Sequence, residues 1–494
     1  MLSVVVFLPL VAAVVPLALP RAGARFVRWW WIAAAAADLA LVIALWVGYP
    51  GGDGYAYEVN LRWIPSISSG YHLGVDGLSL PLLALTAVLF LACAVYSLRQ
   101  DQRVRSFAVL FLFLESVSLG LFVSLDLILF FVFFDLSIVG MYFVIAGWGH
   151  RDAARAALKF FLYTFVGSLA LLVGFIALYV TAAPHTFDIV ELTRQTPLAG
   201  GGWAAGLVLL ALGIGFAIKT PTVPFHTWLP PAHTEAPAAG SAILAGVLLK
   251  MGTYGFVRIA MPILPEAWRR YAVVFVVIGV VSVLYGALVA LGQRDFKRMI
   301  AYTSVNHMGY IVLAVGAAGL VANSDAEARQ LAVTGAVTQM VSHGLITGAL
   351  FLLAGVLYER GGTYDMDQYG GLAAGAPRFA GLTAAAAFAS LGLPGFSGFI
   401  AEFQIFTGSL GPAPVATVLA FLGILVTAAL FLRAFQKVFL GEPKANEPTA
   451  DLTVAEGASI APLLVLAVVV GVFPRFLLDL IEPASRSVLN LLAR

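Results

Sequence analysis

The sequence predicts an all-α integral membrane protein with about 14 transmembrane helices. Of its 494 residues, 61% are hydrophobic and only 11% are charged, whereas a soluble domain of this length would need more charge to cover its surface. Apolar runs of about 18 residues or more recur along the chain, and each can cross a hydrocarbon core about 30 Å thick. The first run, Leu2 to Leu19, has no basic segment before it and no small-residue cleavage site after it. We therefore expect a retained first span rather than a signal peptide.

Proline, glycine and charged residues separate the apolar runs and set the expected limits of each span. We place the spans at 2–20, 28–48, 78–98, 106–124, 127–147, 154–181, 203–230, 238–260, 271–291, 297–318, 330–358, 378–410, 414–437 and 455–480. Two longer connections, 49–77 and 182–202, are rich in glycine, proline and polar residues and are expected to lie in water. Residues 1–494 are expected to form a single polytopic domain in the lipid bilayer.

The basic residues fall mainly on one side of this topology. Of the 28 lysines and arginines, 17 lie in odd-numbered loops or at the span ends beside them, and nine lie in even-numbered loops, at the span ends beside those or in the C-terminal tail; the other two, Lys219 and Lys250, lie deep inside spans. Positively charged loops usually remain in the cytoplasm. The sequence therefore predicts that the odd-numbered loops are cytoplasmic and that both termini lie outside.

Two of the predicted spans are interrupted. The seventh contains Pro221 and Pro224, and the twelfth contains the run Leu393-Pro-Gly-Phe-Ser-Gly398. Proline removes an amide donor and clashes with the preceding turn, so both helices should break near the membrane centre. Broken helices at matching places in two halves are typical of transporters built from repeats. We expect helices 1–3 in 1–105, two inverted five-helix repeats in 106–260 (helices 4–8) and 271–437 (helices 9–13), and helix 14 in 455–480.

Seven ionisable side chains lie at mid-span positions. An ionisable group at this depth costs at least about 2.5–3.5 kcal/mol on insertion scales, so each indicates a functional role. They are Glu115, Asp135, Lys219, Lys250, His307, His343 and Glu402.

The choice of lysine favours groups that change their charge. The chain has 22 arginines and six lysines, yet the two basic residues placed deepest in the predicted spans, Lys219 and Lys250, are both lysines. Arginine would serve a static ion pair equally well but cannot release its proton, whereas a buried lysine can. Asp135 follows an apolar wall, Phe130–Phe134, and its expected cationic partner is Lys219. Glu115 is an alternative partner or a structural residue bonded to a neighbouring helix.

The sequence lacks the usual signs of a cofactor or metal site. Cys93 is the single cysteine, which excludes disulfides within the chain, a chain-borne iron–sulfur cluster and a thiolate zinc site. His226, His233 and Glu235 have a spacing that suggests a metal, but they lie among prolines without helical i,i+4 geometry, so we expect none there. No P-loop, GxSxG or paired CxxC motif occurs, and we expect no nucleic-acid partner.

Four motifs resemble those of the antiporter-like membrane subunits of respiratory complex I, a family shared with multisubunit sodium/proton antiporters. They are IKTPTVPFHTWLPPAHTEAP at 218–237, LGVDGLS at 73–79, DFKRMIAYTSVNHMG at 295–309 and QMVSHGL at 339–345. Most branches of this family carry lysine after the break in helix 12, whereas the M-type branch carries glutamate. Because Glu402 occupies that position, the chain resembles the M-type branch of the NADH:quinone oxidoreductase subunits. We also expect no long lateral helix of the L-type branch after helix 14.

The resemblance implies roles for these residues. Asp135 corresponds to the helix-5 carboxylate and Lys219 to its helix-7 partner, Lys250 is the central lysine, and Glu402 is the distal residue of the second half-channel. His307 and His343 are the relays between Lys250 and Glu402. The family normally has glutamate at the position of Asp135. Because aspartate is one methylene shorter, its contact with Lys219 would need a bridging water molecule or a shifted backbone.

The resemblance also implies a setting. Protons would move through two half-channels in a bacterial plasma membrane, beside L-type and N-type antiporter-like neighbours. Electron transfer through FMN, iron–sulfur clusters and quinone would take place in other subunits. Two alternatives remain open. The first is that the chain is the D-type subunit of a multisubunit sodium/proton antiporter, and Glu402 argues against it. The second is that the chain is a structural membrane scaffold, and the use of lysine and the broken helices argue against that.

Overall fold

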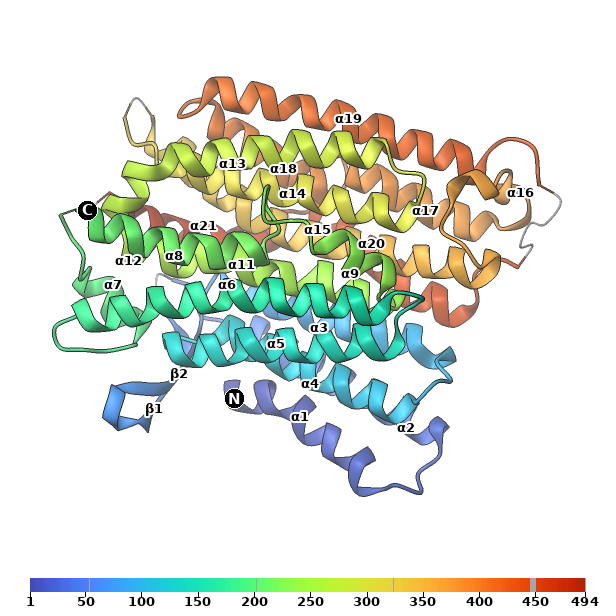
Figure 1. Ribbon diagram of the computed structural model, residues 1–494, viewed down its shortest axis with the longest axis horizontal. Coiled ribbons are helices and arrows are strands. Elements are labelled where there is room, and N and C mark those ends of the chain that lie inside the picture. The colour runs from blue at the N-terminus through green and yellow to red at the C-terminus, as the bar shows by residue number, and fades with distance from the viewer. Residues whose placement is uncertain (53, 201, 323, 445–449, 494) are drawn as a thin grey trace.

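The protein is a bundle of long helices that lie side by side (Figure 1). The computed structural model describes residues 1–52, 54–200, 202–322, 324–444 and 450–493. Arg494, which contributes to the charge comparison above, lies outside the described residues. In Figure 1 the N-terminal helices occupy one edge of the bundle and α19 the opposite edge. This arrangement agrees with the predicted all-α membrane fold.

The first part of the chain contributes three helices and a small sheet. The elements are α1 (Leu2–Ala18), α2 (Ala24–Val47), β1 (Ala56–Ile64), η1 (Pro65–Ile67), β2 (Ser69–Val75), α3 (Ser79–Tyr96) and η2 (Ser97–Arg99). The loop predicted at 49–77 is therefore largely an antiparallel hairpin, in which Asn60 lies opposite His72. His72 is buried and bonds to Glu58 on β1 (2.7 Å) and to Asp188 in the distant loop before α7 (2.5 Å). These contacts fix the hairpin to the helical bundle.

The first predicted repeat contains an interrupted helix. Its elements are α4 (Val104–Val123), α5 (Leu127–Trp148), α6 (Ala153–Thr181), α7 (Ile189–Gln195), α8 (Trp203–Lys219), α9 (Leu229–Glu235), α10 (Ala238–Ile243), η3 (Leu244–Leu248), α11 (Leu249–Gly255), η4 (Phe256–Ala260) and α12 (Met261–Ile263). The predicted seventh span is thus divided into α8 and α9, with Lys219 as the last residue of α8. The predicted eighth span runs from α10 to α12 and includes two π-helical segments, η3 and η4.

The second predicted repeat has the corresponding break. Its elements are α13 (Pro265–Leu291), α14 (Phe296–Ala318), α15 (Ala326–Gly361), η5 (Met366–Gln368), α16 (Leu372–Gly375), α17 (Pro377–Ser390), α18 (Ser397–Leu410) and α19 (Pro414–Phe439). The predicted twelfth span is divided into α17 and α18, and Glu402 lies on α18.

A repeated backbone contact supports the division into two inverted units. Asp126, the N-cap of α5, forms a β-bridge with Asp188, the N-cap of α7, and Asp295, the N-cap of α14, forms one with Asp365, the N-cap of η5. Two backbone hydrogen bonds of 2.8–2.9 Å close each bridge. The elements beside these bridges, α7 and α16, lie at opposite ends of the bundle in Figure 1. This is the expected position, because a repeat with an odd number of helices ends on the other side of the membrane and the next repeat is therefore inverted.

The end of the chain differs from the prediction. Instead of one span at 455–480, the structure has α20 (Val454–Val472) followed by a separate helix, α21 (Arg475–Leu492). Leu477, Ile481 and Val488 of α21 are buried, while its charged residues lie on other faces. The predicted span at 455–480 ends too late. The apolar side chains at the start of the amphipathic helix α21 continue the hydrophobic run of α20 beyond the end of that helix.

Ten helices in the described part of the chain are long and apolar enough to cross a membrane. The four other predicted spans correspond to α1, to α14 and to the two interrupted helices, α8–α9 and α17–α18. The count of 14 crossings stays a prediction.

Candidate functional site

Lys250 lies at the centre of the bundle, between the two π-helical segments. It is completely buried. Its Nζ donates a hydrogen bond to the carbonyl oxygen of Ala245 (2.5 Å) and lies 2.7 Å from Nδ1 of His343 on α15. π-Helical turns are frequent at functional sites because they displace backbone groups from the regular ladder. Here the local geometry gives the ammonium a backbone acceptor within its own helix.

Two glycines allow the helices that carry Lys250 and His343 to approach each other. A Cβ atom at Gly344 would lie 2.9 Å from the carbonyl oxygen of Gly246, closer than real Cβ contacts. Small residues of this kind let membrane helices approach backbone to backbone. The lysine and the histidine therefore meet through backbone packing as well as through side-chain length.

The contacts continue from His343 to Glu402 through His307. The two imidazole rings have centroids 5.4 Å apart, and Nδ1 of His307 lies 3.5 Å from Oε1 of Glu402. Hydrogen bonds on both sides hold the His307 ring: Nε2 of Gln339 lies 3.2 Å from its Nδ1, and Oγ of Ser390 lies 3.3 Å from its Nε2. These groups surround a cavity of about 10 Å³, which is about the smallest volume that holds a water molecule.

The break in the predicted twelfth span determines the position of Glu402. Gly392, just after α17, has a φ of +76°, a left-handed conformation that glycine adopts without steric cost. The ideal Cβ position at Gly392 is already occupied by Oε2 of Glu402, whose Cδ lies 3.4 Å from it. Glycine therefore leaves the space that the carboxylate fills.

Lys219 lies on the other side of Lys250, in a separate cluster. Its Nζ donates to Oγ of Ser137 on α5 (2.8 Å) and lies 4.7 Å from the centre of the Phe134 ring. Asp135 is only half-buried, one of its oxygens has no partner among the described residues, and no ion pair within 4.0 Å joins it to Lys219 there. The expected Asp135–Lys219 pair is therefore not in direct contact, and Ser137 takes the lysine's hydrogen bond.

No hydrogen bond in the described chain links Lys219 directly to Lys250. The two residues lie on helices α8 and α11, which pack closely at Gly252 and Thr220. The Thr220 hydroxyl is buried and has no partner among the described atoms. A polar group therefore lies where α11 packs against the end of α8.

His233 and Lys297 form a polar branch that sequence analysis did not assign. His233, on α9, is completely buried, stacks on Phe351 with centroids 4.4 Å apart, and has two ring nitrogens without partners in the described structure. Lys250 and Lys297 both act on it electrostatically. Lys297, the first residue of the predicted span 297–318, was counted with the basic residues of the preceding loop. It is completely buried, and its Nζ donates to the carbonyl oxygen of Ala236 (2.5 Å).

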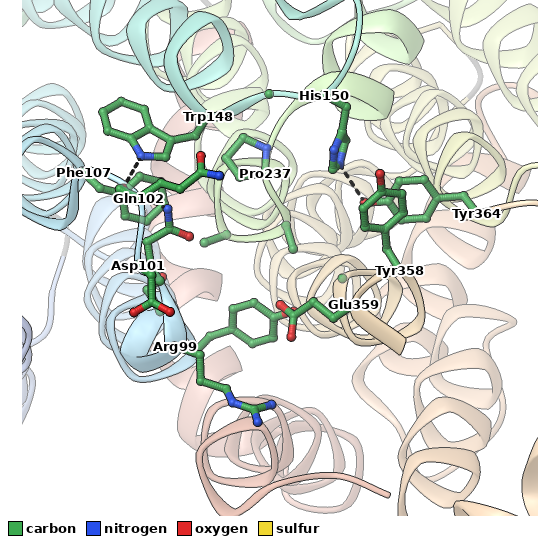
Figure 2. Close-up of a pocket in the computed structure, with 17 residues that line it drawn as sticks. Arg99, Asp101, Gln102, Phe107, Trp148, His150, Pro237, Tyr358, Glu359 and Tyr364 are labelled. Carbon is green, nitrogen blue, oxygen red and sulfur yellow. Dashed lines mark hydrogen bonds between the residues drawn. The ribbon is translucent and has the colours of Figure 1, made fainter. Parts of the chain in front are cut away.

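Beyond this branch, a cavity of about 500 Å³ opens at one end of the bundle (Figure 2). In Figure 2, His150 and Tyr364 lie together on one side, joined by a 3.3 Å hydrogen bond, while Arg99 and Asp101 lie on another. His150 is partly covered, with its ring centroid 4.4 Å from that of Tyr358. Burial, together with the Lys297 ammonium, lowers the pKa of His150 to about 4, so His150 is neutral at neutral pH.

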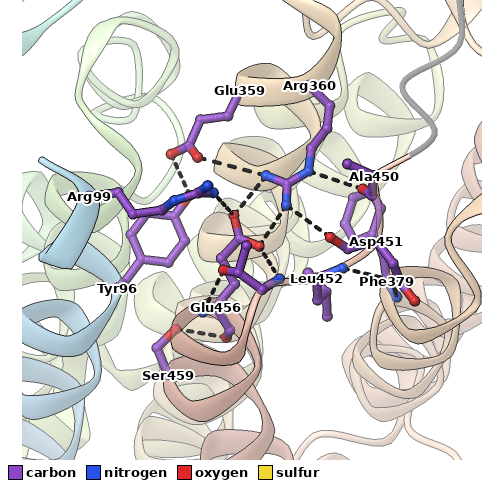
Figure 3. A network of polar contacts seen from close by, with 11 residues as sticks. Tyr96, Arg99, Glu359, Arg360, Phe379, Ala450, Asp451, Leu452, Glu456 and Ser459 are labelled. Carbon is purple, nitrogen blue, oxygen red and sulfur yellow. Dashed lines mark hydrogen bonds and ion pairs between the residues drawn. The ribbon is translucent and has the colours of Figure 1, made fainter.

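A network of charged side chains closes the bundle beside this cavity (Figure 3). Arg360, at the end of α15, binds both oxygens of Glu456 on α20, at 2.7 and 2.6 Å. Arg99 after α3 reaches the same carboxylate at 3.4 Å, and Tyr96 donates to Glu359 at 3.2 Å. Bidentate arginine–carboxylate pairs fix geometry strongly. The network therefore ties α3, α15 and α20 together and leaves the cavity mouth open.

Glu115 is not part of the contacts around Lys219 or Lys250. It is completely buried on α4, and Asp38 on α2 acts on it electrostatically. Sequence analysis passed over Asp38, although an aspartate in the middle of the apolar span 28–48 was a visible signal. For Ser137 there was no such signal, because serine is common in membrane helices.

The described residues contain no group of three or more His, Cys, Asp or Glu side chains that could hold a metal ion. The chemistry that the buried side chains offer is proton exchange. Lysine, histidine and glutamate each exist in two protonation states. Lys250 and His343 lie at hydrogen-bond distance and His307 lies 3.5 Å from Glu402, while the two imidazole rings between them have centroids 5.4 Å apart. Broken helices combined with such a buried series define a membrane transport protein.

Comparison with known proteins gives the family. Residues 124–429 match the family model described as "NADH:quinone oxidoreductase/Mrp antiporter, TM", so the chain belongs to that family. It is 41% identical over 446 residues to NADH-quinone oxidoreductase subunit M of Rickettsia conorii, covering 89% of this chain and 87% of that one. The M-type resemblance inferred from Glu402 is thereby confirmed.

Solved structures have the same fold. A chain of respiratory complex I from Thermus thermophilus matches with a TM-score of 0.90 and 32% identity, covering 100% of both chains. A chain of the Mrp complex from Dietzia sp. DQ12-45-1b matches with a TM-score of 0.85 and 24% identity, covering 100% of this chain and 99% of that one. The second likeness concerns the fold alone.

Proposed function

We propose that this chain is the M-type, proton-translocating membrane subunit of an NADH:quinone oxidoreductase. The observation that carries the proposal is the buried series Lys250, His343, His307 and Glu402, with separations of 2.7 Å between Lys250 and His343 and 3.5 Å between His307 and Glu402. Mid-membrane ionisable groups are costly and mark ion pathways. The names of the relatives support a redox setting with NADH and quinone. On the family resemblance, electron transfer through FMN, iron–sulfur clusters and quinone takes place in other subunits.

Each residue in the series has a role that follows from its chemistry. Lys250 passes a proton to Nδ1 of His343, since an ammonium N–H donor directly faces a ring nitrogen that can accept. His343 and His307 can pass a proton on because an imidazole ring can accept at one nitrogen and donate from the other. Glu402 receives the proton at the break between α17 and α18, and the small cavity beside it accommodates a bridging water.

The cavity in Figure 2 is the proposed place of proton uptake. Its walls come from odd-numbered loops, which the charge distribution places in the cytoplasm. From there, His150, Lys297 and His233 lead toward Lys250. Release would occur past Glu402 on the opposite side, where both termini lie.

Lys219 and Asp135 are proposed to control this movement rather than to lie in the series. A proton on Lys219 adds a positive charge on the helix that packs against α11. Asp135 stabilises that charge without direct contact, since charge attraction falls only gradually with distance. In this proposal, the first half-channel lies in the repeat 106–260 and the second half-channel lies in the repeat 271–437.

The proposed partners are the L-type and N-type antiporter-like subunits of the same complex. The D-type subunit of a multisubunit sodium/proton antiporter is a second candidate, because the matching family model covers both kinds of protein. Purification of the tagged chain in mild detergent distinguishes the two. NADH-driven quinone reduction should co-purify with this chain. A stable complex of antiporter subunits without that activity would overturn the proposal in favour of the second candidate.

A further inference from the structure

Two buried carboxylates lie outside the series from Lys250 to Glu402. Asp38 on α2 and Glu115 on α4 both have 0% exposure. All four of their carboxylate oxygens lack a hydrogen-bond partner among the described residues. Buried polar groups are almost always paired, so four unsatisfied oxygens in one region require an explanation.

Helix geometry places the two side chains at the same depth. Trp31 on α2 packs against Phe107 and Phe111 on α4, with ring centroids 5.9 and 5.2 Å apart. Asp38 follows Trp31 by two turns, on the same face of α2, and Glu115 follows Phe111 by about one turn on α4. Because α2 and α4 are alternate spans, they run in the same direction. The two carboxylates therefore lie within about one helical turn of the same depth, and Asp38 acts electrostatically on Glu115.

The neighbouring elements supply no charge that would balance the pair. The titratable groups on the elements packed against α2 and α4 are Tyr71 and His72 (β2), Cys93 and Tyr96 (α3), Asp135 and Tyr142 (α5), and Lys250 and Tyr254 (α11); α1 has none in Leu2–Ala18. Of these, the Cys93 thiol interacts with Glu115. That thiol is uncharged and bonds to the carbonyl oxygen of Ala239 at 3.6 Å.

Two ionised carboxylates are unfavourable in such a place. Each would be a buried charge without a partner, and the two like charges would repel each other. One shared proton removes the repulsion and leaves a single charge, which is held by a strong charge-assisted hydrogen bond from the O–H group of one acid to an oxygen of the other. A second proton removes the remaining charge. Such carboxyl pairs titrate as one unit.

We propose that Asp38 and Glu115 form a proton-binding site, a carboxyl pair that holds at least one proton at neutral pH and is separate from the transport series. Proton binding at this pair joins α2 to α4. Complete deprotonation places two negative charges between these helices and weakens their contact. The proposal does not depend on the transport function.

Infrared spectroscopy of the purified complex in H₂O and D₂O, without turnover, tests the pair. At neutral pH, the difference spectra of wild type against Asp38→Asn and of wild type against Glu115→Gln should each show loss or displacement of the C=O stretch of a protonated carboxylic acid. The band should shift in D₂O. Glu442→Gln, which alters an exposed carboxylate, is the matched control and should affect only carboxylate bands.

Either variant suffices if the other fails to assemble, because both substitutions are nearly isosteric. A second measurement is thermal stability as a function of pH. The stability of the wild type should decline at high pH, and the Asp38→Asn/Glu115→Gln double variant should show a smaller decline. Difference spectra without a protonated carboxyl band in either variant would overturn the proposal. Stability that depends on sodium concentration in the wild type, and loses that dependence in the variants, would also overturn it and indicate a cation site.

Discussion

Gly392→Ala is a small change that should displace Glu402 and little else. The position has positive φ and lies directly against the carboxylate, so a methyl group there occupies the space of Oε2. The carboxylate is the flexible end of its side chain and has to retreat by about 1 Å to reach ordinary contact distance. Its closest titratable partner is His307, at 3.5 Å from Oε1, and we expect the displacement to lengthen that separation.

The size of the effect follows from this distance. With an effective dielectric constant of about 20, opposite unit charges attract by ~4.7 kcal/mol at 3.5 Å and ~3.7 kcal/mol at ~4.5 Å. A loss of about 1 kcal/mol corresponds to roughly a fivefold weaker stabilisation of a proton transferred to the imidazole beside the carboxylate. Alanine at positive φ costs a further ~1–2 kcal/mol of local backbone energy.

Proton-to-electron ratios in reconstituted vesicles measure the functional part of this change. We expect Gly392→Ala to lower the proton transfer rate several-fold and to lower the measured ratio. Gly395→Ala is the matched control, since Gly395 also has positive φ (+99°) but a Cβ there meets nothing within 4 Å. It carries the same backbone strain without the collision. Equal ratios for the two variants would refute the link between Glu402 position and transport.

Two further predictions concern other parts of the protein. Lys219→Arg, like Lys219→Ala, should abolish most redox-driven pumping in the same vesicles while the complex still assembles, because arginine keeps its proton; normal pumping by the arginine variant would favour a static ion pair. Burial lowers the pKa of His72, but hydrogen bonds and charge from Asp188 and Glu58 raise it above its ordinary value of 6.5 overall. Since the folded-state pKa is raised, this stabilisation is complete below 6.5 and is lost as pH rises through the raised pKa. Thermal unfolding should show that decline in the wild type and a smaller one in Asp188→Asn, and an identical decline in both would contradict it.

The features that depend on sequence pattern alone were predictable. Long apolar runs located the spans, and Pro221, Pro224 and the run Leu393–Gly398 located both helix breaks. Proline and glycine act locally on the backbone, so their effect can be inferred without knowing what packs nearby. Charged residues inside apolar runs were equally visible, as Lys250 and Glu402 show.

The features that depend on packing were not predictable. Lys297 and Arg298 are adjacent at the start of α14, yet Lys297 is buried and Arg298 is exposed. A sequence does not reveal which of two neighbouring basic side chains turns inward, because that depends on the acceptor provided by Ala236 in another helix. The same holds for Ser137, which binds Lys219 only because α5 and α8 place the two groups together.

The central claim is that protons travel through the buried series to Glu402. The most direct test is the proton-to-electron ratio of the complex in vesicles with Glu402→Asp and Glu402→Gln. Aspartate keeps a titratable carboxyl group and should retain most pumping, whereas glutamine cannot accept and release a proton and should lose it. A glutamine variant that pumps at the wild-type ratio would contradict the account, because protons would then leave by a route that does not include Glu402.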